Sequence, residues 1–163
     1  GIKIDKTAHT GVEGLYACGE ATGGMHGADR IGGLSSANGI VFGRIAGASA
    51  AQAALDAPEA AAPMDIALPQ HGIATADAER LTRCLKRTMS TYCMINRTEA
   101  GLSKALQQLE SLQDDATALS KPHANDSEIA ALARLQSQIQ LAQEMVKAMR
   151  KRTESLGSHY RAN

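Results

Sequence analysis

Glycine is concentrated in one part of this 163-residue chain, and this constrains how that part can fold. Eleven of the 15 glycines lie between Gly11 and Gly47. Because glycine has no side chain and adopts positive φ readily, such a stretch favours tight turns and close approach of the backbone to another group. The segment GLYACGEATGGMHGADRIGGLSS predicts a short strand, a glycine-rich turn and a helix that begins at Ser35–Ser36. A second short strand is expected for IKID, residues 2–5.

The helix expected next, over residues 36–55, has no polar face. Its large apolar residues lie on all sides and are Ile40, Val41, Phe42, Ile45 and Leu55, and alanine fills most other positions of its second half. A helix that is apolar nearly all round is normally buried inside a larger protein. We therefore expect this part of the chain, taken alone, to self-associate.

The composition changes after residue 55. Three of the four prolines fall in DAPEAAAPMDIALPQHGIA, residues 56–74, which is typical of a linker. Residues 75–163 contain only Gly101 and Gly157 and have apolar residues at helical spacing. The expected organisation is therefore a first domain over 1–55, a linker over 56–74 and a helical domain over 75–163.

Three helices are expected in this helical domain, and each begins at a capping residue. Thr75 and Thr98 are predicted N-caps, and Asn125 with Glu128 forms a capping-box pattern. The third helix is predicted to end at Gly157, since glycine commonly follows a helix C-terminus. The sequence therefore predicts a mainly α protein with a few short β-strands.

Charge and cysteine content exclude several classes of protein. Lys+Arg and Asp+Glu are both 17, and this zero net charge argues against a nucleic-acid partner. Cys18, Cys84 and Cys93 have neither a CxxC nor a metal-ligand spacing, so we expect no metal site and a reducing, cytoplasmic setting. No apolar run reaches the roughly 18 residues that a membrane-spanning helix needs.

Charged side chains are interleaved with the glycines. Glu20 can accept hydrogen bonds from ligand hydroxyls, and Arg30 can bind a carboxylate or phosphate through two parallel hydrogen bonds. The helix N-terminus at Ser35–Ser36 offers free N–H groups and partial positive charge to a ligand. The spacing differs from GxGxxG and GxxxxGK[ST], so the usual phosphate-binding loops are excluded. A purely structural glycine-rich turn is the alternative interpretation.

The motifs GLYACGE, HGADRIGG and VFGR closely resemble the last flavin-domain segment of the fumarate reductase/succinate dehydrogenase flavoprotein family, which includes L-aspartate oxidase. More weakly, LKRTMSTYCMINRTEAGLSKALQQLESL and ESLGSHYRAN resemble the helical C-terminal domain of that family. The resemblance implies the C-terminal piece of a Rossmann-like FAD domain followed by a three-helix bundle. It also implies FAD as cofactor and hydride transfer between FAD and a dicarboxylate such as fumarate or succinate.

The resemblance implies roles for five residues. Glu20 resembles the residue that hydrogen-bonds the ribityl or ribose hydroxyls of FAD. Ser35 and Ser36 match positions at the pyrimidine side of the isoalloxazine ring. Arg30 resembles the arginine that binds and polarises a substrate carboxylate. His26 is assigned a supporting catalytic role near the flavin, with a structural histidine as the alternative.

This chain departs from the family pattern at four positions. Asp29 and Leu34 stand where the family usually has Asn, Asn38 stands where Asp is common, and Leu156 replaces an Arg. Asp29 is expected to neutralise part of the charge of Arg30. These departures leave the cofactor assignment intact, but they make another enoate or a 2-oxo acid an alternative substrate.

Two parts of the family's flavoproteins have no counterpart in this chain: the GxGxxG unit that holds the ADP half of FAD, and a capping domain with a proton-donating arginine. We therefore expect a C-terminal fragment that is inactive alone and binds FAD weakly or not at all. Expected partners are the N-terminal remainder of the flavoprotein, a dicarboxylate and an iron–sulfur electron-transfer subunit. Any membrane association is expected through partner subunits. Alternatives are an L-aspartate oxidase fragment and a stand-alone helical module that docks an electron-transfer partner.

Overall fold

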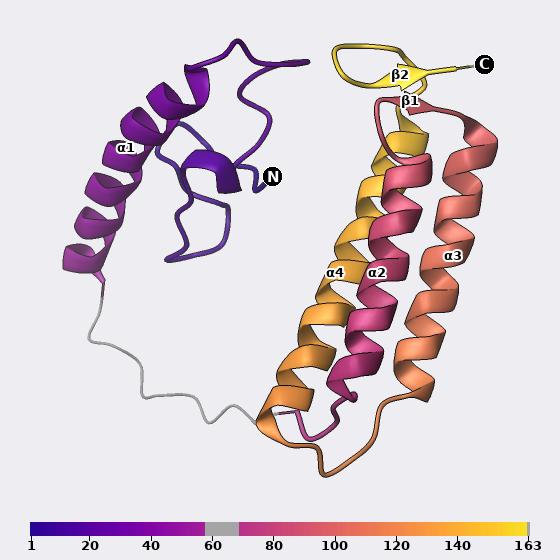
Figure 1. Ribbon diagram of the computed structural model, residues 1–163. Helices are drawn as coiled ribbons and strands as arrows, with labels where there is room; N and C mark the ends of the chain where they lie inside the picture. Colours follow the sequence, from indigo (N-terminus) through magenta and orange to yellow (C-terminus); the bar gives the residue numbers. More distant parts are fainter. Residues whose placement is uncertain (58–68, 163) are drawn as a thin grey trace. The chain divides into compact units, whose positions relative to one another are not determined.

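A computed structural model describes residues 1–57 and 69–162 of the chain. The chain divides into two compact units, Gly1–Asp65 and Ile66–Asn163 (Figure 1). Most of the predicted linker, residues 58–68, lies outside the described residues. The mainly helical fold with few short strands is confirmed.

Unit 1 consists of extended loops, one 3-10 turn and one long helix. The turn is η1 (Gly19–Ala21) and the helix is α1 (Leu34–Asp56). The two segments predicted as strands form only isolated bridges, Ile2 to Thr22 in parallel and His9 to Tyr16 in antiparallel orientation. This differs from the prediction because a strand needs several paired residues and further neighbours to be stable.

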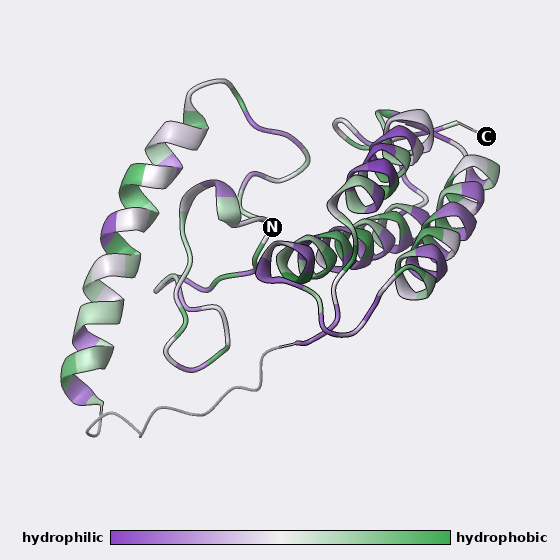
Figure 2. Cartoon of the chain, turned by 60° about the horizontal axis from the view of Figure 1, so that its bottom comes forward, coloured by the Kyte–Doolittle hydropathy of each residue, from purple (hydrophilic) through white to green (hydrophobic). Residues whose placement is uncertain are grey.

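Helix α1 is apolar without being amphipathic, as the sequence predicts. Ile40, Val41 and Leu55 are 75%, 53% and 81% exposed, and Ala46 is the one buried residue of the helix. Figure 2 shows hydrophobic and hydrophilic residues mixed around α1 with no single apolar stripe. The described residues of unit 1 therefore leave most of the apolar surface of this helix uncovered.

Unit 2 is the predicted three-helix bundle. It contains α2 (Thr75–Tyr92), α3 (Glu99–Ala118) and α4 (Asp126–Lys151), which run side by side in alternating directions (Figure 1). Apolar residues at helical spacing form its core, and the large side chains buried most completely are Ile73, Leu81, Leu102, Leu109, Leu135, Ile139 and Val146. The apolar stripes read from the sequence therefore face the core of the bundle.

Two of the three predicted helix starts are correct in detail. The Thr98 hydroxyl accepts a hydrogen bond from a backbone N–H of the first turn of α3 at 3.0 Å. The Asn125 side chain and the Glu128 side chain form the predicted capping box at the start of α4. Helix α2 differs by one residue, because its N-cap is Ala74, without a side-chain cap, and Thr75 is its first helical residue.

The last helix ends earlier than predicted. Helix α4 stops at Lys151, and the chain turns away in extended conformation at Arg152. Gly157 has φ of +59° and serves instead in a turn that brings Leu156 and His159 together in an antiparallel bridge. The glycine thus adopts the left-handed conformation typical of a helix stop, but the prediction that it ends the helix was wrong.

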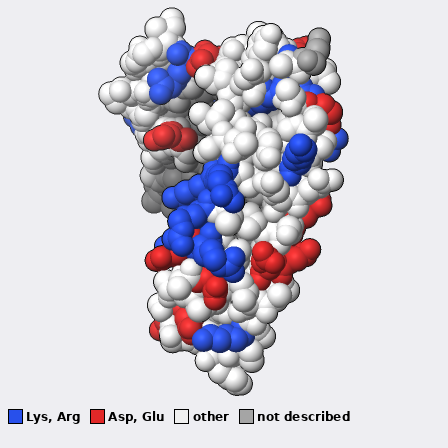
Figure 3. All heavy atoms as spheres, turned by 45° about the vertical axis from the view of Figure 1, so that its right-hand side comes forward, with Lys and Arg blue, Asp and Glu red and all other residues white. Residues whose placement is uncertain are grey.

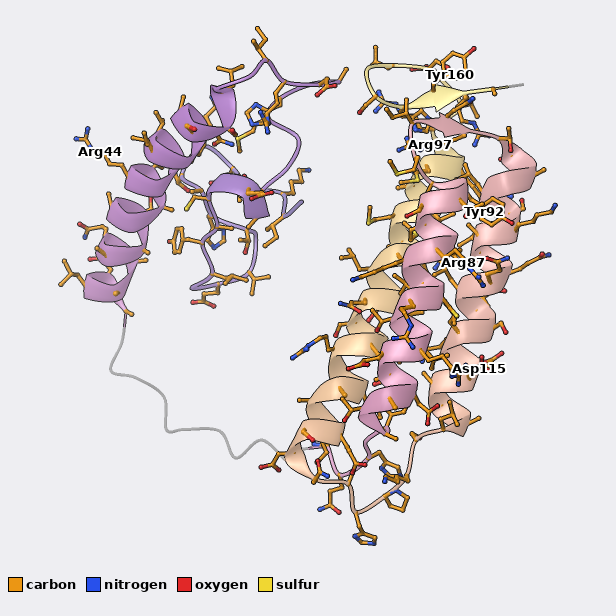
Figure 4. The ribbon with its side chains drawn as sticks, viewed as in Figure 1. Arg44, Arg87, Tyr92, Arg97, Asp115 and Tyr160 are labelled. Atoms are coloured by element: carbon orange, nitrogen blue, oxygen red, sulfur yellow. The ribbon has the colours of Figure 1, made fainter. Side chains whose placement is uncertain are left out.

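The C-terminal segment returns to the bundle as a short strand. Strand β2 (Tyr160–Arg161) pairs in parallel with β1 (Asn96–Arg97), which lies between α2 and α3 in the sequence. Figure 4 shows Arg97 and Tyr160 at the same end of the bundle. The Arg97 guanidinium contacts the imidazole of His159, a side chain that is only 8% exposed. Nothing in the local sequence pattern indicated this pairing.

One carboxylate links three elements at this end of the bundle. Glu99, at the start of α3, accepts from Arg150 of α4 at 2.6 Å and from Arg161 of β2 at 2.9 Å. These hydrogen bonds, with the one from Arg161 first, lower the pKa of Glu99 below its ordinary value. Glu99 therefore holds the C-terminal strand to the bundle in its ionised form.

Part of the predicted linker packs onto unit 2. Ile73 is fully buried in the bundle core. Gly72 and Lys121 exchange two backbone hydrogen bonds, at 3.0 Å and 2.9 Å. A Cβ atom added at Gly72 would lie 2.5 Å from the Cβ of Ala124 and 2.6 Å from the carbonyl carbon of Glu128. Only glycine fits this contact between the incoming chain and α4.

Surface properties agree with the charge balance of the sequence. On the face shown in Figure 3, a group of Lys and Arg side chains has Asp and Glu side chains close to it.

Among residues 1–57 and 69–162, no helix combines the length and the hydropathy needed to cross a bilayer.

We predict that Gly72→Ala destabilises unit 2 by about 1–3 kcal/mol, because the new methyl group overlaps backbone atoms that have little room to move. Urea unfolding of the whole chain, followed by circular dichroism, measures this. Gly47→Ala is the matched control: its Cβ meets nothing within 4 Å in the interior of α1, so no destabilisation is expected. Equal stability of Gly72→Ala and the unsubstituted chain would contradict the packing described.

We predict that Glu99→Gln destabilises the chain at about pH 7 and has little effect at about pH 3. The folded-state pKa of Glu99 is lowered, so its stabilisation is present above the unfolded-state pKa and is lost as the pH falls through the folded-state value. Denaturation midpoints at the two pH values provide the measurement. Glu110→Gln, which removes an exposed carboxylate without an ion pair to the described residues, is the control. A pH-independent effect of Glu99→Gln would contradict this account.

Candidate functional site

Unit 1 contains a cavity of about 460 Å³ that brings all the predicted site residues together. Such a volume is in the range of small-molecule and cofactor sites. The residues that line it come from η1, the loop after it and the first turns of α1; they are Gly19, Glu20, Thr22, His26, Arg30, Ser35, Ser36, Asn38 and Gly39. Residues up to 20 positions apart in the sequence therefore line the same cavity.

The start of α1 gives the cavity a partial positive charge. Gly33 precedes the helix with φ of +88°, a left-handed conformation that favours glycine, and provides no side-chain cap. Its carbonyl accepts from the Ser36 N–H at 3.1 Å, whereas the Ser35 N–H makes no backbone hydrogen bond to the described residues. An uncapped N–H at a helix N-terminus attracts an acceptor or an anion.

Turn η1 approaches α1 through two glycines. Gly19 has φ of +66°, and a Cβ added there would lie 3.9 Å from the Cα of Gly39. The Thr22 hydroxyl donates to the Gly19 carbonyl at 2.6 Å and closes the turn. This geometry places Glu20, an exposed carboxylate, in the lining of the cavity together with the helix start.

Arg30 keeps its charge available. The Asp29 carboxylate accepts the Arg30 backbone N–H at 2.8 Å, and within the described part of the chain no ion pair joins it to the Arg30 guanidinium. Asp29 therefore forms no direct ion pair with Arg30, and the partial neutralisation expected from this neighbour stays a prediction. An exposed guanidinium beside the cavity is suited to a carboxylate or phosphate group.

Sequence reasoning identified five lining residues as site residues and missed the other four, Gly19, Thr22, Asn38 and Gly39. The side chain of Asn38 contacts the imidazole of His26, with 3.2 Å between Nδ2 and Nε2. Helical spacing could have found two of the four, because residues three and four positions after Ser35 share its face of α1.

We predict that Gly33→Ala weakens the start of α1 by about 1–2 kcal/mol, since alanine is strained at positive φ. Amide hydrogen exchange at Ser36, which bonds to the Gly33 carbonyl, is expected to accelerate. Gly32→Ala is the matched control, because a Cβ there also meets open space without a left-handed backbone. Unchanged exchange at Ser36 in Gly33→Ala would contradict this view of the helix start.

Both units match known protein families. The family model described as FAD binding domain matches residues 1–36, which contain most of the cavity lining. An uncharacterized FAD-dependent oxidoreductase from Methanocaldococcus jannaschii is 34% identical over 99% of this chain. A fumarate reductase (CoM/CoB) protein from Methanothermobacter marburgensis, named as one of that enzyme's subunits, is 30% identical, and the L-aspartate oxidase from Mycobacterium bovis is 35% identical, each again over 99% of the chain.

The chain spans 28 to 31% of the length of these relatives. A second family model, described as fumarate reductase flavoprotein C-term, matches residues 82–163, which comprise most of the helical bundle and the C-terminal strand. This match covers half of the chain, and the chain therefore belongs to the fumarate reductase flavoprotein C-terminal family.

Proposed function

We propose that this chain forms the C-terminal part of an FAD-dependent oxidoreductase, with its glycine-rich cavity as one wall of the flavin and substrate site. The observation that carries the proposal is the convergence of Glu20, Arg30 and Ser35 on one cavity. Most of that lining belongs to the segment that matches an FAD-binding family model.

The residues present fit FAD by their chemistry. A reduced flavin carries negative charge that a helix N-terminus stabilises. The uncapped start of α1 provides such a helix N-terminus. Added Cβ atoms at Gly24, Gly32, Gly33 and Gly39 meet nothing within 4 Å, so this backbone has open space along it. Asn38 Oδ1 is buried and has no hydrogen-bond partner among the described residues, so one acceptor of this wall is unused there.

Each residue then has a defined task. Glu20 accepts hydrogen bonds from hydroxyl groups of the FAD chain. The Ser35 N–H and the hydroxyls of Ser35 and Ser36 donate to acceptor atoms of the flavin ring. FAD, when bound, supplies the redox chemistry of hydride transfer.

Arg30 binds the substrate in this proposal. Its guanidinium fixes one carboxylate through parallel hydrogen bonds and withdraws electron density from the carbon atoms beside that carboxylate. Because the Asp29 carboxylate is bonded to backbone and forms no ion pair with the guanidinium among the described residues, the N–H groups of Arg30 remain free for this task. A dicarboxylate such as fumarate or succinate is the substrate class that we propose.

L-Aspartate is the second candidate substrate. The L-aspartate oxidase relative is 35% identical to this chain and the fumarate reductase relative 30% identical, each over 99% of the chain. Fumarate and L-aspartate are both four-carbon dicarboxylates, so one arginine could hold a carboxylate of either. A stand-alone docking module is less well supported, because the match of residues 1–36 to an FAD-binding family model supports a cofactor-binding role for the glycine-rich unit.

The partners and location that we propose follow the same family. The relatives named as subunits support an assembly with an electron-transfer partner, for which an iron–sulfur protein is our proposal. The sparse, odd set of cysteines supports the cytoplasm as location, with any membrane association through partner proteins. Self-association through the exposed side of α1 is proposed for the chain alone.

We predict that Arg30→Lys, in the FAD-containing protein that includes this chain, lowers kcat/KM for fumarate reduction by about 10²-fold with FAD content unchanged. Lysine keeps the charge but loses the two parallel hydrogen bonds to the carboxylate. Turnover with a reduced dye and the flavin absorbance of the same sample provide the two measurements.

Arg44→Lys is the matched control. Arg44 is an exposed arginine of α1 that projects away from the glycine-rich loops in Figure 4, and it does not line the cavity. Its substitution is expected to leave kcat/KM unchanged. Normal turnover in Arg30→Lys, or equal losses in both variants, would contradict the substrate role of Arg30. Absence of flavin from the purified larger protein that includes this chain would contradict the proposed function as a whole.

A further inference from the structure

His26 and Asn38 form a side-chain pair within the lining of the cavity. Nδ2 of Asn38 lies 3.2 Å from Nε2 of His26, and both residues are half-buried. Asn38 Oδ1 is buried and has no hydrogen-bond partner among the described residues. His26 comes from the loop after η1, whereas Asn38 lies in the second turn of α1, so the pair joins the two sides of the site.

The orientation of the Asn38 amide decides which nitrogen of His26 carries a proton. In the orientation observed, the Asn38 Nδ2–H donates to Nε2, which must therefore be the unprotonated nitrogen. The opposite orientation would leave the amide N–H₂ of Asn38 buried without an acceptor. An unpaired buried N–H is rarer in proteins than an unpaired buried C=O, so the observed orientation is favoured.

We propose that Asn38 is a positioning residue that keeps Nε2 of His26 as an acceptor and its proton on Nδ1. His26 then meets a bound ligand as a neutral donor through Nδ1–H, toward a carboxylate or carbonyl oxygen. Glu20 and Arg30 are the charged groups that line the same cavity, and neither forms an ion pair with His26 in the described part of the chain.

Arg30 and His26 therefore have different roles toward a bound ligand in this proposal. Arg30 supplies the positive charge, and His26 supplies a hydrogen bond from Nδ1–H. Asn38 bonds to Nε2 on the other side of the imidazole ring and so holds the orientation of that ring. The identity of the ligand rests on the proposed function, whereas the protonation pattern of His26 does not.

The test is a long-range ¹H–¹⁵N spectrum of the histidine rings in the whole ¹⁵N-labelled chain, at about pH 8, above the ordinary titration range of histidine. His26 is expected to show a protonated Nδ1 and an unprotonated Nε2. His9 gives an internal reference of opposite pattern, because the Gly11 N–H donates to its Nδ1 at 3.1 Å and places its proton on Nε2.

Two variants separate positioning from mere packing. Asn38→Asp has nearly the same shape but offers only acceptors, so it is expected to move the proton of His26 to Nε2. Asn38→Ala is expected to give a mixture of both forms with faster ring exchange. Gln52→Ala, an exposed amide later in α1, is the control and is expected to leave His26 unchanged.

A protonated Nε2 on His26 in the unsubstituted chain would overturn the inference, as would the same His26 pattern in Asn38→Asp. The His26 spectra of the unsubstituted chain and of Asn38→Asp can be measured without bound flavin and without enzymatic turnover. Absence of FAD from the larger protein would therefore contradict the proposed function alone, and an unexpected His26 pattern would contradict this inference alone.

Discussion

The candidate site depends on where α1 begins. The left-handed backbone at Gly33 lets the helix start at Leu34, and Gly33 provides no side-chain cap. The Ser35 N–H lies in the first turn and has no backbone partner among the described residues. One turn of the helix later, Asn38 reaches the loop that carries His26. The partial charge of the helix start, the position of the serines and the contact with the loop all follow from this one turn.

The two units differ in how much apolar surface they bury. Unit 2 has an aliphatic core, two capped helices and a C-terminal strand held by Glu99. In the described part of unit 1, Ala8 and Ala46 are the buried apolar residues, and large apolar side chains of α1 are exposed. A glycine-rich wall with little core of its own gains order from what binds to it, which is consistent with a cofactor-binding role.

The sequence was informative wherever local chemistry decides structure. Apolar periodicity predicted the bundle, the capping pattern at Asn125 predicted the start of α4, and Ser35–Ser36 placed the start of α1 to within a residue or two. Contacts between distant residues could not be predicted in this way. The pairing of β1 with β2 and the bond between Glu99 and Arg161 join residues about 60 positions apart, and no periodic pattern encodes them. Likewise, the role of Asn38 emerges only from its approach to His26.

Amide hydrogen exchange in the FAD-containing protein, measured before and after removal of the flavin, tests whether the glycine-rich wall contacts the cofactor. Loss of FAD is expected to accelerate exchange in residues 19–39, around η1 and the start of α1. Exchange in the bundle core, including Leu109 and Ile139, is expected to change little. Unchanged exchange over 19–39 on flavin removal would contradict the claim that this glycine-rich wall contacts the cofactor.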